Sequence, residues 1–289
     1  MADKASNTIA FQGLPGAYSE LASHLAYPKM RTLPTAAFED TFAAVRDGAA
    51  RLAMIPIENS VAGRVADIHR LMPDSGLRII AEHFLRVNHH LLASPGATLK
   101  TVRTVHSHVH ALGQCGKLIA KLGLEAVVHA DTAGAAAEIA AAGDPTQAAI
   151  ASALAGEVYG LKSLRASVED AEHNTTRFLV MSRRAARPKP GAHPPVTTFV
   201  FRVRNVPAAL YKAMGGFATN GVNMTKLESY MLGGDFNATQ FYADIEGDPR
   251  DRNVKLALEE LGFFTAELHL LGTYPAAAFR HGGKALATT

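Results

Sequence analysis

Short apolar runs alternate with helical patterns over the first two thirds of the chain. The apolar runs read as strands, and the helix candidates between them include two that end at a glycine. Strands that alternate with helices are typical of a mostly parallel α/β sheet. The predicted strands are Leu52–Ile57, Val102–His106, Ala126–Ala130, Ala148–Ala151 and Phe178–Met181, and the predicted helices are Ala111–Leu122 and Ala135–Ala142.

The pattern changes after the last of these strands. Residues 182–195, SRRAARPKPGAHPP, hold four of the fourteen prolines and several basic residues without apolar periodicity, which predicts an extended linker. We place the domain boundary near residue 190. Residues 197–274 then follow the order β-α-β-β-α-β of a ferredoxin-like domain, with a turn at Gly233 and Gly234. We therefore expect a first domain at 1–185, a linker at 186–195 and a second domain with a C-terminal tail at 196–289.

The composition suits a globular protein with a sizeable core. The chain has 289 residues, of which 48% are hydrophobic and 19% charged. No apolar run approaches the ~18–20 residues of a membrane-spanning helix, and Met1–Asn7 lacks the apolar segment of a secretory signal. The single cysteine, Cys115, excludes an internal disulfide and a thiolate zinc site. We expect a reducing, cytoplasmic compartment and no membrane partner.

The charge pattern argues against a nucleic-acid partner. The net charge is +3 and the calculated isoelectric point is about 9.0, but the chain has no basic runs interleaved with aromatic residues. A mild basic bias fits a small anionic substrate better than a polyanion.

Small polar residues follow most of the predicted strands. Such residues cap helices and leave backbone N–H groups at the positive end of the helix dipole. Strand ends share one edge of a parallel sheet, so these helix N-termini should meet at a crevice that suits carboxylates or phosphates. Because any α/β domain repeats this pattern, ordinary helix capping explains it as well. The residues are Ser19, Asn59, Ser60, Ser107, His108, Asp131, Thr132 and Ser152.

Two histidine groups could carry chemistry. His106, His108 and His110 alternate, so on one strand they would share a face and could bind a metal. A helix that starts at Ser107 would break this geometry, and we predict that helix rather than a metal site. The adjacent pair His89-His90 would point to opposite faces of a strand.

A cluster of hydrogen-bond donors stands at the start of the last apolar run. In NTTRFLV (174–180), Arg177 and two threonines directly precede a buried strand. A turn and a cap at Asn174 and Thr175 would explain the cluster structurally, and a catalytic role requires a partner motif. Glu58 is open to two interpretations, as a general acid or base or as the partner of an arginine. Cys115 is interpreted as a small buried hydrophobic residue.

These segments, taken in order, resemble the prephenate dehydratase family. GLPGAYSE (13–20) is similar to the family's G-P-x-G-[ST]-[YF]-[ST] opening, and PIENSVAG (56–63) to its P-[IV]-E-N-S element. SHVHALGQC (107–115) is similar to S-H-P-Q-A-L-x-Q-C, with Val-His in place of Pro-Gln, and DTAGAA (131–136) to S-T-A-x-A-A, with aspartate in place of serine. NTTRFLV (174–180) matches the N-x-T-R-F signature that carries the family's catalytic threonine.

The downstream region resembles an ACT regulatory domain. NVPAAL (205–210) and NMTKLESYM (223–231) stand where the family has the P-G-A-L and E-S-R-P phenylalanine-binding motifs. Ala208 replaces the glycine, and Tyr230-Met231 replace Arg-Pro. By position, the resemblance implies that the allosteric phenylalanine site contains Asn205, Ala208, Ala209, Leu210, Asn223, Glu228 and Ser229.

The resemblance also implies a fold and an assembly. The catalytic part is expected to fold like a type II periplasmic binding protein, as two α/β lobes with a cleft. One lobe would hold residues ~8–85 plus ~165–182, and the other residues ~86–164. A homo-oligomer, dimer or tetramer, would form partly through the ACT sheets. Neither a cofactor nor a metal is implied.

The implied activity is that of a carbon–oxygen lyase in L-phenylalanine biosynthesis, which decarboxylates and dehydrates prephenate to phenylpyruvate. Thr176 would give a proton or a hydrogen bond to the departing hydroxyl, and Arg177 would either supply positive charge or anchor a carboxylate. L-Phenylalanine is the expected effector. The alternatives are an arogenate dehydratase and a non-catalytic amino-acid sensor. The substrate-binding positions are Ser19, Glu58, Asn59, Ser60, Ser107, His108, Gln114, Thr132, Ala133, Thr175, Arg177 and Phe178.

Overall fold

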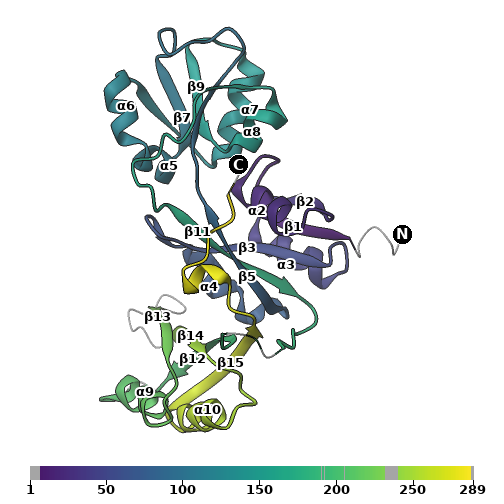
Figure 1. Ribbon diagram of the computed structural model, residues 1–289, viewed down its shortest axis with the longest axis vertical. Helices are drawn as coiled ribbons and strands as arrows, with labels where there is room; N and C mark the ends of the chain where they lie inside the picture. The colour runs from purple at the N-terminus through teal and green to yellow at the C-terminus, as the bar shows by residue number, and fades with distance from the viewer. Residues whose placement is uncertain (1–6, 190, 192, 205, 232–239, 288–289) are drawn as a thin grey trace. The chain divides into compact units, whose positions relative to one another are not determined.

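The structure is a computed structural model (Figure 1). No helix among the residues that it describes has the length and apolar character needed to cross a membrane. The described residues are 7–189, 191, 193–204, 206–231 and 240–287, and the side chains of Ala66 and Asp67 are left out.

Contacts divide the chain into two units. The chain crosses from one unit to the other inside strand β5 (Arg78–Arg86) and again inside β11 (Thr175–Ser182). Unit 1 comprises Met1–Val65, His83–Phe178 and Lys284–Thr289, and unit 2 comprises Ala66–Glu82 and Leu179–Gly283.

The first sheet has the strand order β2-β1-β3-β11-β5, with the short β4 paired to β3. Strand β1 runs parallel to both β2 and β3. The middle of β1 is fully buried, which explains its uninterrupted apolar sequence. The bounds are β1 (Thr8–Gln12), β2 (Arg31–Thr35), β3 (Leu52–Asn59) and β4 (Gly63–Arg64), with helices α2 (Tyr18–Ala26) and α3 (Phe38–Arg46) between the strands.

The second sheet, also in unit 1, lies between two helical layers (Figure 1). Its order is β10-β6-β9-β7-β8. Successive residues of β9 point to opposite faces of the sheet. Ile150 packs with Leu112 of α5 and Leu118 of α6 on one face, and Ala149 packs with Ile139 of α7 on the other. The bounds are β6 (His90–Ala93), β7 (Thr104–His108), α5 (Val109–Gln114), α6 (Gly116–Leu122), β8 (Glu125–His129), α7 (Thr132–Ala142), β9 (Gln147–Ala151), α8 (Ala153–Tyr159) and β10 (Lys162–Arg165).

Two local expectations for this sheet need correction. The helix predicted over Ala111–Leu122 is two helices, because Cys115 between them has φ −118° and ψ 21°, outside the helical region. The sheet is mixed rather than mostly parallel. Strand β6 runs antiparallel to β9 and to β10, and neither β6 nor β10 was predicted.

The predicted β-α-β-β-α-β order of the downstream region is confirmed in unit 2. All neighbouring strands of the sheet β13-β14-β12-β15 are antiparallel. Helices α9 and α10 pack on one face of this sheet, around Phe199, Phe217 and Leu261. The turn expected at Gly233-Gly234 lies outside the described residues. The bounds are β12 (Val196–Val203), α9 (Ala209–Thr219), β13 (Met224–Tyr230), β14 (Gln240–Glu246), α10 (Arg252–Phe264) and β15 (Thr265–Tyr274).

Residues 66–82 also belong to unit 2. They form α4 (Ala66–Leu71), the 3-10 turn η1 (Pro73–Ser75) and the first half of β5. Gly272 of β15 allows a close approach, because a Cβ there would lie 2.2 Å from the carbonyl oxygen of Ile79. A second 3-10 turn, η2 (Ala278–His281), follows β15.

Ala208 carries a testable local strain. It caps α9 with φ 61° and ψ 18°, the left-handed region that glycine adopts without steric cost. We expect Ala208→Gly to raise the free energy of unfolding by about 0.5–1 kcal/mol, as relief of strain exceeds the added freedom of the unfolded chain. Urea denaturation measures the change. The control is Ala209→Gly at the first helical position, which should destabilise the protein. If both variants stabilise the protein, or if neither does, the proposed backbone strain at Ala208 is wrong.

Candidate functional site

The side chain of Asn59 joins the end of β3 to the start of β11. Its Oδ1 accepts hydrogen bonds from the backbone N–H groups of Val61 (2.9 Å) and Ala62 (2.8 Å), which fixes which end of the amide is oxygen. Its Nδ2 therefore donates to Asn174 Oδ1 (2.8 Å) and to Thr176 Oγ1 (3.0 Å). Because the Thr176 oxygen accepts from Asn59, its own proton is directed elsewhere.

A reciprocal pair of contacts locks the same two strands together. The Ser60 backbone N–H donates to the Thr175 carbonyl (2.9 Å), and the Thr175 N–H donates to Ser60 Oγ (3.0 Å). The Ser60 hydroxyl in turn donates to the His173 carbonyl (2.9 Å). These contacts fix the position of β11 along β3, and with it the position of Thr176 relative to Asn59.

Gln114 brings helix α5 of the second sheet to this cluster. Its Oε1 accepts from Asn174 Nδ2 (2.9 Å), and its Nε2 donates to Asn59 Oδ1 (3.4 Å). Residues far apart in the sequence, from PIENS, SHVHALGQ and NTTRF, thus meet in one hydrogen-bond network. The sequence could only suggest this meeting through the motifs.

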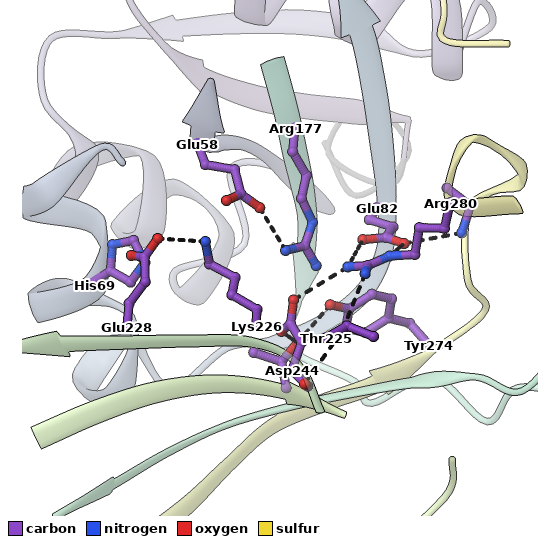
Figure 2. Close-up of polar contacts among 12 residues, drawn as sticks. Glu58, His69, Glu82, Arg177, Thr225, Lys226, Glu228, Asp244, Tyr274 and Arg280 are labelled. Carbon is purple, nitrogen blue, oxygen red and sulfur yellow. Dashed lines mark hydrogen bonds and ion pairs between the residues drawn. The ribbon is translucent and has the colours of Figure 1, made fainter. Parts of the chain in front are cut away.

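Arg177 points away from Thr176. Successive residues of a strand face opposite sides, and the Arg177 guanidinium forms an ion pair with Glu58 (Nη1 to Oε1, 3.0 Å; Figure 2). The Arg177 side chain is 2% exposed and that of Glu58 is 29% exposed. Of the two interpretations of Glu58, the structure shows the ion pair with an arginine.

The predicted helix caps are right at Asp131, Ser152 and His108 and wrong at others. Asp131 caps α7, whose first residue is Thr132, and accepts from the Gly134 N–H (2.7 Å). Ser152 caps α8 and accepts from the Ala155 N–H (3.0 Å).

Ser107 is not a cap. It lies inside β7, fully buried, and donates to the Ile150 carbonyl (2.6 Å). The cap of α5 is His108, whose Nδ1 accepts from the His110 N–H (3.3 Å). The strand continues past the expected boundary because a buried serine satisfies its hydroxyl on the neighbouring strand. Ser60 is not a cap either, since a turn and β4 separate it from α4.

The GLPG loop packs against the N-terminus of helix α8. A Cβ on Gly16, which has φ +90°, would lie 2.7 Å from the Ala155 Cα, and the Ser152 hydroxyl donates to the Gly16 carbonyl (2.6 Å). Ser19 is buried in the first turn of α2 and is not its cap, a position that Ala17 occupies. Sequence reasoning missed Glu20, whose Oε2 accepts from the Gly16 N–H (2.7 Å) and so holds this loop.

The remaining predicted positions include residues of the core and of strand β7. Ala133 and Phe178 are buried. His106 and His108 lie on β7 but His110 lies on α5. No group of three or more His, Cys, Asp or Glu side chains suited to a metal occurs in the described part of the chain. Cys115 is buried, as predicted, and burial raises the pKa of its thiol.

A pocket of about 600 Å³ lies elsewhere in unit 1. Leu21 and Leu25 of α2, Leu154 of α8, and His90 line it with six further residues. None of the predicted substrate-binding residues is among these, so the pocket is separate from the Asn59 cluster.

The predicted effector positions lie in unit 2. Asn205 is outside the described residues. Asn223 donates to Glu246 Oε2 (2.9 Å). Glu228 contacts Lys226 (2.6 Å) and His69 (3.3 Å), as Figure 2 shows, whereas Ser229, the next residue of β13, faces the other side.

Comparison with known proteins identifies the family. The family model described as prephenate dehydratase matches residues 9–186. The chain belongs to the prephenate dehydratase family. This confirms the resemblance drawn from the motifs, and the family is one of hydro-lyases in aromatic amino acid biosynthesis.

Three relatives show how far the similarity extends. A bifunctional N-acyl-homoserine lactone acylase/prephenate dehydratase from Komagataeibacter europaeus is 55% identical over 94% of this chain and 97% of its own length. Arogenate dehydratase/prephenate dehydratase 1 from Arabidopsis thaliana is 36% identical over 94% of this chain and 73% of the relative. The structure of prephenate dehydratase from Arthrobacter aurescens in complex with L-Phe is 30% identical, with a TM-score of 0.84 over 93% of this chain and 90% of that chain.

The ion pair of Glu58 and Arg177 makes an asymmetric prediction about stability. Glu58→Ala removes one charged contact of the buried guanidinium and should lower the free energy of unfolding by about 1.5 to 3 kcal/mol. Arg177→Met should cost less, because Glu58 is within reach of water and methionine fills most of the vacated volume. The double variant should recover part of the loss of Glu58→Ala. Chemical denaturation measures all three; equal costs for the two single variants would argue against the asymmetry.

Proposed function

We propose that this chain is a prephenate dehydratase, which converts prephenate to phenylpyruvate with loss of carbon dioxide and water. The observation that carries the proposal is the hydrogen bond from Asn59 Nδ2 to Thr176 Oγ1. It occupies the hydroxyl oxygen as an acceptor and leaves the hydroxyl proton for a ligand. Family membership supports the same assignment.

The main requirement of the reaction is a proton donor for the departing hydroxide. The bond from the ring carbon to its carboxylate breaks, its electron pair enters the ring, and the C–O bond opposite breaks as the ring becomes aromatic. The departing hydroxide takes a proton and leaves as water. Thr176 supplies that proton, or a hydrogen bond that lowers the barrier until solvent supplies it. A threonine hydroxyl is a weak acid, so its position and the amide donor beside it provide the catalysis.

Two amides of the cluster and two helix N-termini are proposed to orient the substrate. Asn59 and Gln114 present amide groups, and the α5 N-terminus with its cap His108 offers backbone N–H groups for a carboxylate. Thr132 and Ala133, at the start of α7, are proposed to do the same. Arg177 is proposed to act through its buried ion pair with Glu58 and not by contact with the leaving group.

The assignment of Thr176 is tested by substitution. Thr176→Ala removes the donor and should lower kcat by about 10²–10⁴-fold, while circular dichroism and thermal unfolding stay close to wild type. Thr176→Ser keeps the hydroxyl and should retain most of the activity. Formation of phenylpyruvate is followed by its absorbance in base. Near-normal turnover by Thr176→Ala would remove Thr176 from the mechanism.

Arogenate is the alternative substrate of the same chemistry, since it carries an amino group where prephenate has a keto oxygen. The Arabidopsis relative is named for both substrates. Parallel assays with prephenate and arogenate, which follow phenylpyruvate and phenylalanine, compare the two values of kcat/KM. We expect prephenate to be preferred.

A second candidate function is hydrolysis of N-acyl-homoserine lactones. The Komagataeibacter relative, similar over nearly its whole length, is named as an acylase as well as a dehydratase. Release of homoserine lactone from an acylated substrate, in wild type and in Thr176→Ala, shows whether this chain has that activity and whether it uses the same threonine.

We propose further that residues 196–289 form an ACT domain that binds L-phenylalanine and inhibits the enzyme, with residues 186–195 as the linker. The β-α-β-β-α-β order and the phenylalanine complex of the Arthrobacter relative support this. Inhibition requires that phenylalanine bind the less active state more tightly. Assembly through the ACT sheets stays a prediction.

Glu228→Gln tests the effector site. Loss of a charged contact in the motif should weaken phenylalanine binding about tenfold or more. The control is Glu267→Gln, which changes an exposed ion pair with Arg202 on the same sheet and should leave binding unchanged. Calorimetry gives the affinity and inhibition curves give the response. No heat of binding to the wild type would refute regulation through this domain.

A further inference from the structure

A chain of polar side chains leads away from Thr176 and ends at His89. Asn59 contacts Thr176 and Asn174, and both Asn59 and Asn174 contact Gln114. Gln114 Oε1 lies 2.9 Å from His89 Nε2. The sequence pattern offered no role for His89 beyond one face of a strand.

The direction of each hydrogen bond in this chain follows from the first. Two backbone N–H groups fix Asn59 Oδ1, so its Nδ2 faces Asn174 Oδ1. Asn174 Nδ2 must then face Gln114 Oε1 (2.9 Å). An amide oxygen only accepts, so His89 Nε2 must carry a hydrogen and donate it to Gln114. The chain thus selects one tautomer of the imidazole.

The other ring nitrogen completes the assignment. Tyr18 Oη lies 2.8 Å from His89 Nδ1 and 2.9 Å from the Asn88 carbonyl. With the hydrogen on Nε2, Nδ1 of the neutral ring is an acceptor, and the single Tyr18 hydroxyl hydrogen is shared between Nδ1 and the Asn88 carbonyl. Burial lowers the pKa of the His89 imidazole and raises that of the Tyr18 hydroxyl, so the neutral ring and the protonated phenol both persist at pH 7.

The backbone around His89 is held as firmly as its ring. The His89 N–H donates to Glu169 Oε2 (2.8 Å), and the His89 carbonyl accepts from the Val168 N–H (3.0 Å). Arg86 binds the same Glu169 carboxylate (3.1 Å). His89 thus stands where two chain segments cross between the two sheets of unit 1, with its 2% exposed ring directed at Gln114.

We infer that His89, as the neutral tautomer with its hydrogen on Nε2, is a positioning residue for the dehydration. It holds the Gln114 amide in place. Gln114 binds Asn174 and adds its contact to the turn N–H groups that hold Asn59, and Asn59 keeps the Thr176 hydroxyl with its proton toward the substrate. The inference rests on the proposed function. It extends the site to a residue that touches neither Thr176 nor the substrate.

Two substitutions separate the two ring nitrogens. In His89→Gln the side-chain nitrogen reaches the place of Nε2 and can still donate to Gln114. In His89→Asn the side-chain oxygen takes the place of Nδ1, which keeps the acceptor for Tyr18 and loses the donor to Gln114. We expect His89→Asn to lower kcat about 10- to 100-fold with a much smaller change in KM, and His89→Gln to recover most of kcat.

A double-mutant cycle shows whether His89 acts through Gln114. In a Gln114→Ala background, His89→Asn should have little further effect on kcat, because the group that it positions is already gone. Full additivity, wild-type kcat in His89→Asn, or equal losses in His89→Asn and His89→Gln would each overturn the inference.

The ring nitrogens can also be observed without any assay. Their 15N shifts in labelled wild-type protein at pH 7 should show the hydrogen on Nε2, and a hydrogen on Nδ1 or on both nitrogens would overturn the inference. Failure of the proposed function can be distinguished from failure of the inference about His89. A wild-type protein that is inactive on both prephenate and arogenate contradicts the proposed function. An active wild-type protein whose His89 variants are unaffected contradicts only the role of His89.

Discussion

The structure of the candidate site depends on the orientation of one amide, that of Asn59. Two backbone N–H groups of the turn after β3 hold its oxygen, so its nitrogen can serve only as a donor to Asn174 and Thr176. If the amide were reversed, the two turn N–H groups would face a nitrogen, and both acceptors would face an oxygen. Asn174 is fully buried, and an acceptor left without a partner there costs about 1–3 kcal/mol, so the reversed state is disfavoured. The local turn therefore determines which hydrogen-bonding role is left for the Thr176 hydroxyl.

The arrangement of elements could be predicted from the sequence to a large extent, because patterning acts within single segments. The order of strands and helices in unit 2 follows directly from period-two and helical patterns, and glycines mark the ends of α6 and α7. The caps Asp131 and Ser152 were also predictable, since their partners lie three residues further along the chain. Errors arose where a partner lies far away in sequence. Ser107 was predicted to be a cap but donates to Ile150 on the adjacent strand, and β6 is identified by its pairing with β9 and β10.

The geometry of the candidate site could not be predicted from the sequence. The motifs group Asn59, Gln114 and Thr176, which the structure joins in one hydrogen-bond network. No pattern says that Arg177 turns its side chain from Thr176 toward Glu58. Strand alternation, applied to Thr176 and Arg177, would have separated the two roles before the structure was known. His89 could not be found in this way, because its role depends on four residues from three distant segments and on the direction of each hydrogen bond between them.

Charged groups buried in unit 2 are also held by hydrogen bonds of defined direction. Glu82 and Asp244 have fully buried side chains, and Arg280 of η2 binds both: its Nε donates to Glu82 Oε1 (2.6 Å) and its Nη2 lies 3.3 Å from Asp244 Oδ2 (Figure 2). Two buried carboxylates near one another repel unless a cation lies between them, and the planar guanidinium has enough donors to serve both.

The turn η2 is thereby tied to β5 and to β14 at the same point. Asp244 pairs in register with Lys226 of β13, the strand that carries the predicted effector motif. Within unit 2, a displacement of β13 is therefore resisted through β14 by a buried ion network rather than by apolar packing alone. Hydrogen bonds between charged groups depend on the angle at the donor, whereas apolar contacts are non-directional. A small displacement of β13 would therefore disturb the contacts of Asp244 and Glu82 with Arg280 within unit 2.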